Sequence, residues 1–187
     1  MISSIVKNIT LIALPFALSN CVAPSYNDTY PAAYNFFLSP NVDAETQASV
    51  VEAANEWTDK TGVQIAIHNG PATCTGDWGC FQITMASEDT LAADAKSEGY
   101  PGHPIGIEYD SGSILILAAQ PVLENQFIVL HEMGHAIGLK HPCEIGPDCK
   151  IYAVMNPVYE MGSLTVSCND QKQYATLRKE TLPSCSD

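Results

Sequence analysis

The sequence has 187 residues, of which 21 are Asp or Glu and 8 are Lys or Arg, giving a formal net charge of −13. Hydrophobic residues make up 46% and charged residues 16%, a composition typical of a folded chain with one sizeable core. So acidic a chain should be repelled by nucleic acid phosphates and by anionic lipid surfaces, and no apolar run reaches the roughly 18 residues of a membrane-spanning helix. We therefore expect neither a nucleic acid partner nor an integral membrane protein.

Residues 1–20 have the pattern of a secretory signal, because a positive charge at Lys7 precedes a mostly apolar stretch. The following Leu18-Ser19-Asn20-Cys21 resembles the lipobox of bacterial lipoproteins, although that motif ordinarily has Gly or Ala before the cysteine. Plain cleavage at Ala17-x-Ser19 is the alternative, and a cytosolic helix is the least favoured reading. We predict an exported protein: either a bacterial cell-surface or outer-membrane lipoprotein, anchored only by lipid on Cys21, or a secreted one.

The seven cysteines also fit an oxidising compartment. An odd number leaves one thiol over, and lipid on Cys21 would leave six that can pair. Proximity in the sequence favours the disulfides Cys74–Cys80, Cys143–Cys149 and Cys168–Cys185. Thiolate metal ligands are the alternative for the pair Cys143 and Cys149.

Residues 21–33 read as a tether, and residues 34–187 as a single domain in which strands and helices alternate. Period-two alternation predicts a strand over 63–68. Further strands are expected at 34–38, 81–85, 105–109 and 113–119, the last two as a hairpin. A helix is predicted over Asp43–Lys60, where Val50, Ala54 and Trp57 form one apolar stripe. Either Asn41 or Asp43 is its expected cap, and Gly62 ends the helix. Shorter helices are predicted over 90–96 and, with Ser167 or Asn169 as its cap, over 167–179.

A second long helix opens at Pro121 and is apolar nearly all round, which indicates burial. It contains His131-Glu132-Met133-Gly134-His135, and His141 follows. Residues four apart share a helix face, so His131 and His135 can bind one ion, while Glu132 lies beside it. Gly138 can turn the chain out of the helix and let His141 complete a three-histidine zinc site with an open fourth position.

The pattern HExxHxxGxxH resembles the zinc motif of the metzincin metallopeptidases. These enzymes carry a methionine beneath the metal, the Met-turn, and Met155 in Val154-Met155-Asn156-Pro157-Val158-Tyr159 matches it. The pattern Met-x-Pro-x-Tyr is closest to matrixins, whose residues after the methionine wall the substrate pocket; here these are Asn156, Pro157 and Tyr159. The resemblance implies an α+β fold: a mixed twisted sheet, a buried zinc-binding helix, a second long helix and a C-terminal helix.

Three departures from the family patterns matter. Pro142 stands after the third histidine, where matrixins usually have Ser. Pro157 stands where serralysins and astacins place a tyrosine, so we predict no tyrosine zinc ligand. The connection from His141 to Met155 is longer than in matrixins.

The predicted activity is that of a zinc endopeptidase acting on polypeptides. Zinc would lower the pKa of a bound water to about 7, and Glu132 would be the general base that takes its proton and passes it to the leaving amine. By resemblance, the substrate would lie along an edge strand, for which we expect 113–119; a plain core strand is the equal alternative. The rival functions are a surface module that holds zinc for structure and a zinc hydrolase of a non-protein amide.

Other binding features are weaker. Bound calcium is compatible with an acidic chain, but no loop shows a ligand pattern such as DxDxDG. His68 and His103 are too few for the structural zinc site of matrixins and read as surface residues. Asp28 could reach back to zinc and confer latency, although a solvated tether residue is the favoured reading. We expect a monomer.

Overall fold

The computed structural model describes residues 30–74, 78–97, 106–109, 112–118, 120–143, 151–157 and 163–185. The predicted signal segment 1–20 and the residues Cys21, Asp28, His103, Cys149 and Tyr159 therefore lie outside the described residues. In chain order the elements are β1 (Ala33–Leu38), α1 (Ala44–Thr61), β2 (Gln64–Asn69), β3 (Cys80–Ala86), α2 (Glu88–Ser97), β4 (Gly106–Tyr109), β5 (Ser113–Leu117), α3 (Val122–Ala136) and α4 (Cys168–Arg178). None of the helices described is long and apolar enough to cross a membrane.

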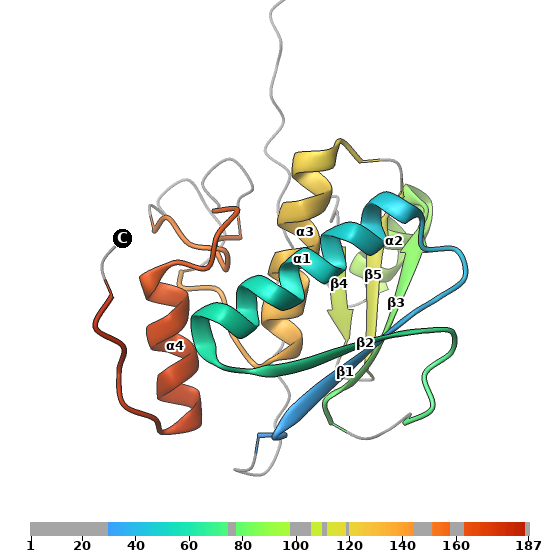
Figure 1. Ribbon diagram of the computed structural model, residues 1–187. Coiled ribbons are helices and arrows are strands. Elements are labelled where there is room, and N and C mark those ends of the chain that lie inside the picture. Colours follow the sequence, from blue (N-terminus) through green and yellow to red (C-terminus); the bar gives the residue numbers. More distant parts are fainter. Residues whose placement is uncertain are drawn as a thin grey trace, which may run out of the picture.

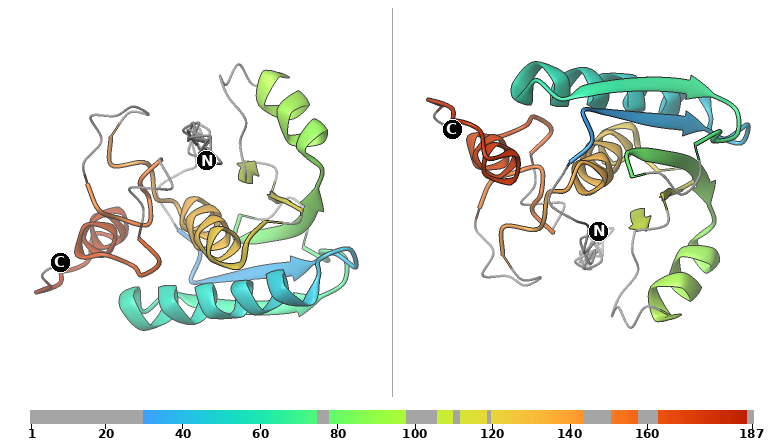
Figure 2. Two further views of the ribbon diagram at one scale, coloured as in Figure 1. Left: turned by 90° about the horizontal axis from the view of Figure 1, so that it is seen from above. Right: turned by 90° about the horizontal axis from the view of Figure 1, so that it is seen from below.

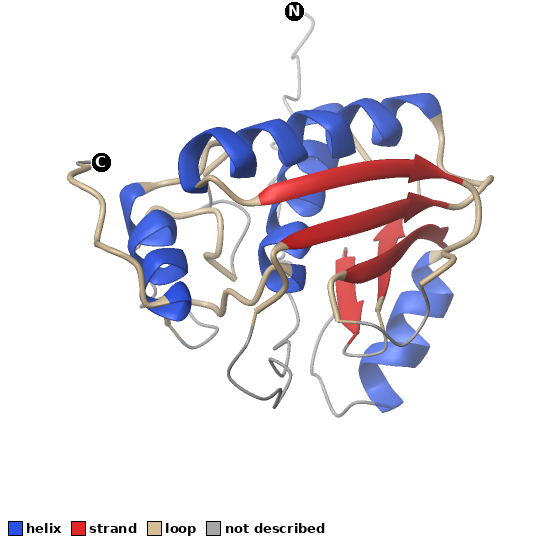
Figure 3. Cartoon of the chain, turned by 60° about the horizontal axis from the view of Figure 1, so that its bottom comes forward, coloured by secondary structure: helices blue, strands red, loops and turns tan. Residues whose placement is uncertain are grey.

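The five strands form one mixed sheet in the order β2-β1-β3-β5-β4 (Figure 1). The pairs among β2, β1, β3 and β5 are parallel, and β4 runs antiparallel to β5 (Figure 3). The predicted α+β fold with a mixed sheet is thus confirmed. One expectation was wrong: 113–119 is not at the edge, because β5 pairs with β3 on one side and β4 on the other. Among the described strands, the sheet ends in β4 on this side and in β2 on the other.

Two apolar clusters lie on opposite faces of the sheet. On one face, Phe36 of β1, Ile83 of β3 and Ile114 of β5 pack with residues of α1 and α3 in the main core. On the other face, Ile107 packs with α2 through Leu91 and Ala95. Figure 2 shows α3 between the sheet and α4.

Helices α1 and α4 begin at capping residues that the sequence predicts. The Asp43 side chain accepts a hydrogen bond from Thr46 N–H at 2.8 Å, and Gly62 ends α1 in the left-handed conformation at φ 76°. Ser167 caps α4. Helix α3 starts at Val122, one residue later than predicted, and its first turn is not buried, since Leu123 is 56% exposed.

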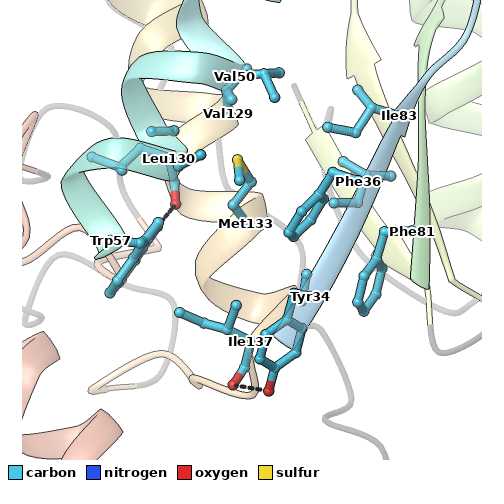
Figure 4. Packing of buried hydrophobic residues seen from close by; sticks show 14 of the residues in the cluster. Tyr34, Phe36, Val50, Trp57, Phe81, Ile83, Val129, Leu130, Met133 and Ile137 are labelled. Carbon is cyan, nitrogen blue, oxygen red and sulfur yellow. Dashed lines mark hydrogen bonds between the residues drawn. The ribbon is translucent and has the colours of Figure 1, made fainter. Parts of the chain in front are cut away.

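Two long-range hydrogen bonds fix α3 against the core (Figure 4). The Trp57 indole donates to the Leu130 carbonyl at 2.9 Å, and the Tyr34 hydroxyl donates to the Ile137 carbonyl at 3.3 Å. Both aromatic residues are fully buried, so their polar atoms need such partners. They hold α3 just before its first histidine and just after its last turn.

Candidate metal centre

Helix α3 and the turn that follows it bring three histidines together. His131 and His135 lie one turn apart on α3, and both are buried. The helix ends at Ala136, and Gly138 adopts φ 104°, a conformation that residues with a side chain rarely take. The chain leaves the helix axis there, and His141 folds back toward the other two rings. Each predicted histidine is therefore where the spacing placed it.

The three rings meet through their Nε2 atoms. The distances are 3.0 Å between His131 and His135, 3.1 Å between His131 and His141, and 3.2 Å between His135 and His141. Nitrogens bound to one zinc ion at about 2.0–2.1 Å with tetrahedral angles would be about 3.3 Å apart. The spacing of the donor atoms thus fits a single zinc ion.

Backbone carbonyls fix the tautomers of two of these rings. Nδ1 of His131 lies 2.7 Å from the Val154 carbonyl, and Nδ1 of His135 lies 2.9 Å from the Leu139 carbonyl. A carbonyl oxygen only accepts, so each Nδ1 must carry the proton and each Nε2 presents a lone pair. Two lone pairs facing each other at 3.0 Å repel unless a cation lies between them, which is a second observation that fits a metal.

Burial keeps the imidazoles uncharged. It lowers the pKa of His131 well below its usual value, with the neighbouring His135 and His141 adding to the shift. It lowers the pKa of His135 to about 4 and, together with His135, that of His141 to about 3. At neutral pH all three are therefore the neutral ligands that a metal requires.

Glu132 lies on α3 beside the histidines, and its side chain contacts the edge strand β4. Its side chain is 1% exposed, and its carboxylate accepts a hydrogen bond from the backbone N–H of Glu108 on β4. Its Oε2 atom is buried without a hydrogen-bond partner in the structure as described. Burial, and then the nearby Glu108 carboxylate, raises the pKa of Glu132 well above its usual value. A bound cation would act in the opposite direction on this pKa.

Two glycines make room around these residues. A Cβ on Gly106 would lie 2.8 Å from Oε1 of Glu132, so β4 approaches the carboxylate only because residue 106 has no side chain. A Cβ on Gly134 would collide with Sδ of Met155 and lie 2.9 Å from the Trp57 ring. The fully buried Met155 therefore lies directly against the helix turn that joins the two histidines; its role as a Met-turn stays a prediction.

Asp170 on α4 holds this methionine segment, and the sequence analysis missed it. Its carboxylate accepts hydrogen bonds from Val154 N–H at 2.9 Å and Met155 N–H at 3.2 Å. Val154 in turn accepts from His131 through its carbonyl, so Asp170 supports a ligand through one peptide unit. Burial raises the pKa of Asp170, while these N–H donors and Ser167 lower it. The pattern Ser167-x-x-Asp170, a capping box, is the sequence signal that could have identified it.

The remaining predicted residues have varied positions. Asn156 is fully buried and donates to the Ile151 carbonyl at 2.7 Å, and Pro157 is also buried. His68 stacks on Phe37 and contacts Asn35, away from the histidine group. Disulfides join Cys74 to Cys80 and Cys168 to Cys185; Cys143 is disulfide-bonded too, and its expected partner, Cys149, lies outside the described residues.

Comparison with known protein families identifies the chain. A family model described as a dual-action HEIGH metallo-peptidase, Peptidase_M57, matches residues 32–143, which is more than half of the sequence. The chain belongs to this metallopeptidase family. The matched region includes the histidine triad and Glu132, and the five letters of the family description correspond to HEMGH here, with Met133 in place of Ile.

Solved structures of myroilysin are also similar to the chain. One has 13% sequence identity and a TM-score of 0.46, with 83% of this chain and 88% of that chain covered. Another has 17% identity and a TM-score of 0.38, with 61% of this chain covered; the match spans about half, 52%, of that myroilysin chain. None of the curated proteins matches the sequence. The family assignment therefore depends on the Peptidase_M57 match.

Proposed function

We propose that this member of the HEIGH metallopeptidase family is a zinc-dependent endopeptidase in which Glu132 is the general base. The observation that carries the proposal is the convergence of three neutral Nε2 donors beside a buried carboxylate with an unpaired oxygen. Among the described residues the group contains three ligands, not four. Three protein ligands with an open position are typical of catalytic zinc sites, whereas structural sites are closed by a fourth.

In the proposed mechanism His131, His135 and His141 hold the ion. Zinc, when bound, supplies Lewis acidity, which promotes loss of a proton from water and stabilises negative charge on a carbonyl oxygen. Oε2 of Glu132 would accept the proton that the attacking water loses, and Glu132 would then pass this proton to the leaving amine. The raised pKa of the glutamate without metal reflects a buried site, in which a carboxylate is a stronger base than in water.

The substrate is proposed to lie along β4 rather than along β5. β4 is an edge strand of the described sheet, and its Glu108 N–H donates to Glu132, so this edge of the sheet runs past the carboxylate. An extended peptide could add to this edge as a further strand. We propose further that the chain is exported, which the disulfides support because they persist in oxidising compartments. Whether lipid on Cys21 anchors the chain or the chain is secreted stays a prediction.

The test is hydrolysis of a mixed peptide library by the full chain, with products identified by mass spectrometry. Glu132→Gln removes the basic oxygen without changing shape, so we expect zinc to stay bound and kcat/KM to fall at least about 10²-fold. Glu124→Gln makes the same change in the first turn of the same helix and should leave the rate unchanged. A Glu132→Gln variant that retains normal activity, or activity that a zinc chelator does not abolish, would refute the proposal.

A further inference from the structure

The turn that carries His141 is held by residues far from it in the sequence. Tyr34 donates to the Ile137 carbonyl, and the Tyr30 ring fills the space where Gly138 would have a side chain, with Cε1 2.7 Å from the Cβ position. The hydrogen bonds nearest to His141 in the sequence come from a side chain on α4. Gln173 contacts Lys140, the residue immediately before the ligand.

Gln173 makes a paired contact with the backbone of Lys140. Lys140 N–H donates to Oε1 of Gln173 at 2.6 Å, and Nε2 of Gln173 donates to the Lys140 carbonyl at 2.9 Å. Two hydrogen bonds from one planar amide fix both the position and the rotation of the backbone that they contact. The Lys140 carbonyl belongs to the peptide bond that leads into His141, so this contact restricts where the His141 ring can lie.

His141 depends on its backbone more than the other two ligands do. His131 and His135 are each oriented by a hydrogen bond from their own Nδ1 to a carbonyl. For His141, the described part of the chain shows hydrogen-bond-distance contacts through Nε2 alone, to the other two ligands. Among the described residues, none hydrogen-bonds to Nδ1 of His141, the second ring nitrogen through which a metal ligand is usually oriented.

We infer that Gln173 is a positioning residue for the third metal ligand, and that its amide replaces the missing support at Nδ1 by immobilising the Lys140 backbone. The inference rests on the proposed function, because it takes His141 to bind zinc. Gln173 lies outside the region matched by the family model, which ends at residue 143. Helix α4 thereby supports two ligands, His131 through Asp170 and His141 through Gln173.

The test is the zinc affinity of the full-length chain, measured by competition with a chelator of known affinity. Gln173→Ala removes both hydrogen bonds and should weaken zinc binding about tenfold, as loss of indirect ligand support commonly does. Gln173→Glu keeps an acceptor for Lys140 N–H but lacks the donor, so its loss should be smaller. Gln171→Ala, the same change two residues earlier on α4, should leave the affinity unchanged; its backbone N–H bond to Ser167 is unaffected by the side chain.

A double-mutant cycle separates positioning from general destabilisation. If Gln173 acts through His141, then Gln173→Ala should have no further effect on zinc affinity in a His141→Ala background. Equal losses with and without His141, or a Gln173→Ala affinity no lower than that of Gln171→Ala, would overturn the inference and leave the proposed function intact. If Gln173→Ala does not fold, Gln173→Glu takes its place in the cycle. Failure of the unaltered chain to bind zinc would overturn the proposed function as well.

Discussion

At the scale of single residues, the site depends on a glycine that leaves room for its neighbours. Gly134 lies between the two helical histidines, and the space beside it is occupied by Met155 and Trp57. Helix propensity alone would favour alanine over glycine at this position by about 1 kcal/mol. The packing opposes this preference, because Met155 and Trp57 are both fully buried and have little room to move.

Gly134→Ala is therefore expected to destabilise the protein, by about 1–3 kcal/mol, despite its better helix propensity. Urea unfolding of the metal-free chain gives the change. Adding Met155→Ala removes the closest colliding atom, so Gly134→Ala should cost less in that background. A stabilising effect of Gly134→Ala alone would show that the methionine does not lie against the helix.

At the scale of elements, α4 links parts of the chain that carry the site. Its residues Asp170 and Gln173, three apart and on one side of the helix, contact the backbone beside Met155 and beside His141. A disulfide from Cys168, the first residue of α4, holds the C-terminal segment to this end of the helix. The helix acts as a brace between the ligand turn and the methionine segment.

Asp170→Asn should cost about 2–3 kcal/mol of unfolding free energy, because a neutral amide keeps one acceptor atom where the carboxylate has two. Those two oxygens receive bonds from Val154, Met155 and Ser167. Urea unfolding at neutral pH provides the measurement. Asp59→Asn is the matched control, since Asp59 is exposed on α1 and loses the same charge. Equal effects of the two substitutions would contradict the bracing role of α4.

At the scale of the whole molecule, the histidine cluster should set the acid stability of the metal-free chain. Burial lowers the pKa of His135 to about 4 and of His141 to about 3, and lowers that of His131 as well. Unfolded histidines take up protons near pH 6.5. Between that pH and about 4, the unfolded state therefore binds more protons than the folded state, and stability falls as the pH falls.

Each such histidine contributes a slope of at most about 1.4 kcal/mol per pH unit. His141→Gln should reduce the slope of unfolding free energy against pH by about this amount between pH 6 and 5. Urea unfolding of chelator-treated protein at several pH values provides the comparison. An unchanged slope would mean that His141 is not buried in its neutral form.

The sequence was sufficient for those features that depend on local spacing. The histidine positions follow from the helix period and from Gly138, and the ends of α1 follow from Asp43 and Gly62. Asp170, Gln173 and the edge position of β4 could not be predicted in the same way. Each depends on which distant segments meet: β4 follows β3 in the chain after α2, yet β5 inserts between them. Such contacts are set by tertiary packing rather than by residue periodicity.

The central claim is that His131, His135 and His141 bind one zinc ion with an open coordination position. The most direct test is zinc X-ray absorption spectroscopy on the purified full chain, combined with its metal content. We predict one zinc per chain, three imidazole nitrogens at about 2.0–2.1 Å and an oxygen ligand in the remaining position. A sulfur ligand at about 2.3 Å, a fourth protein nitrogen or the absence of stoichiometric zinc would contradict the account.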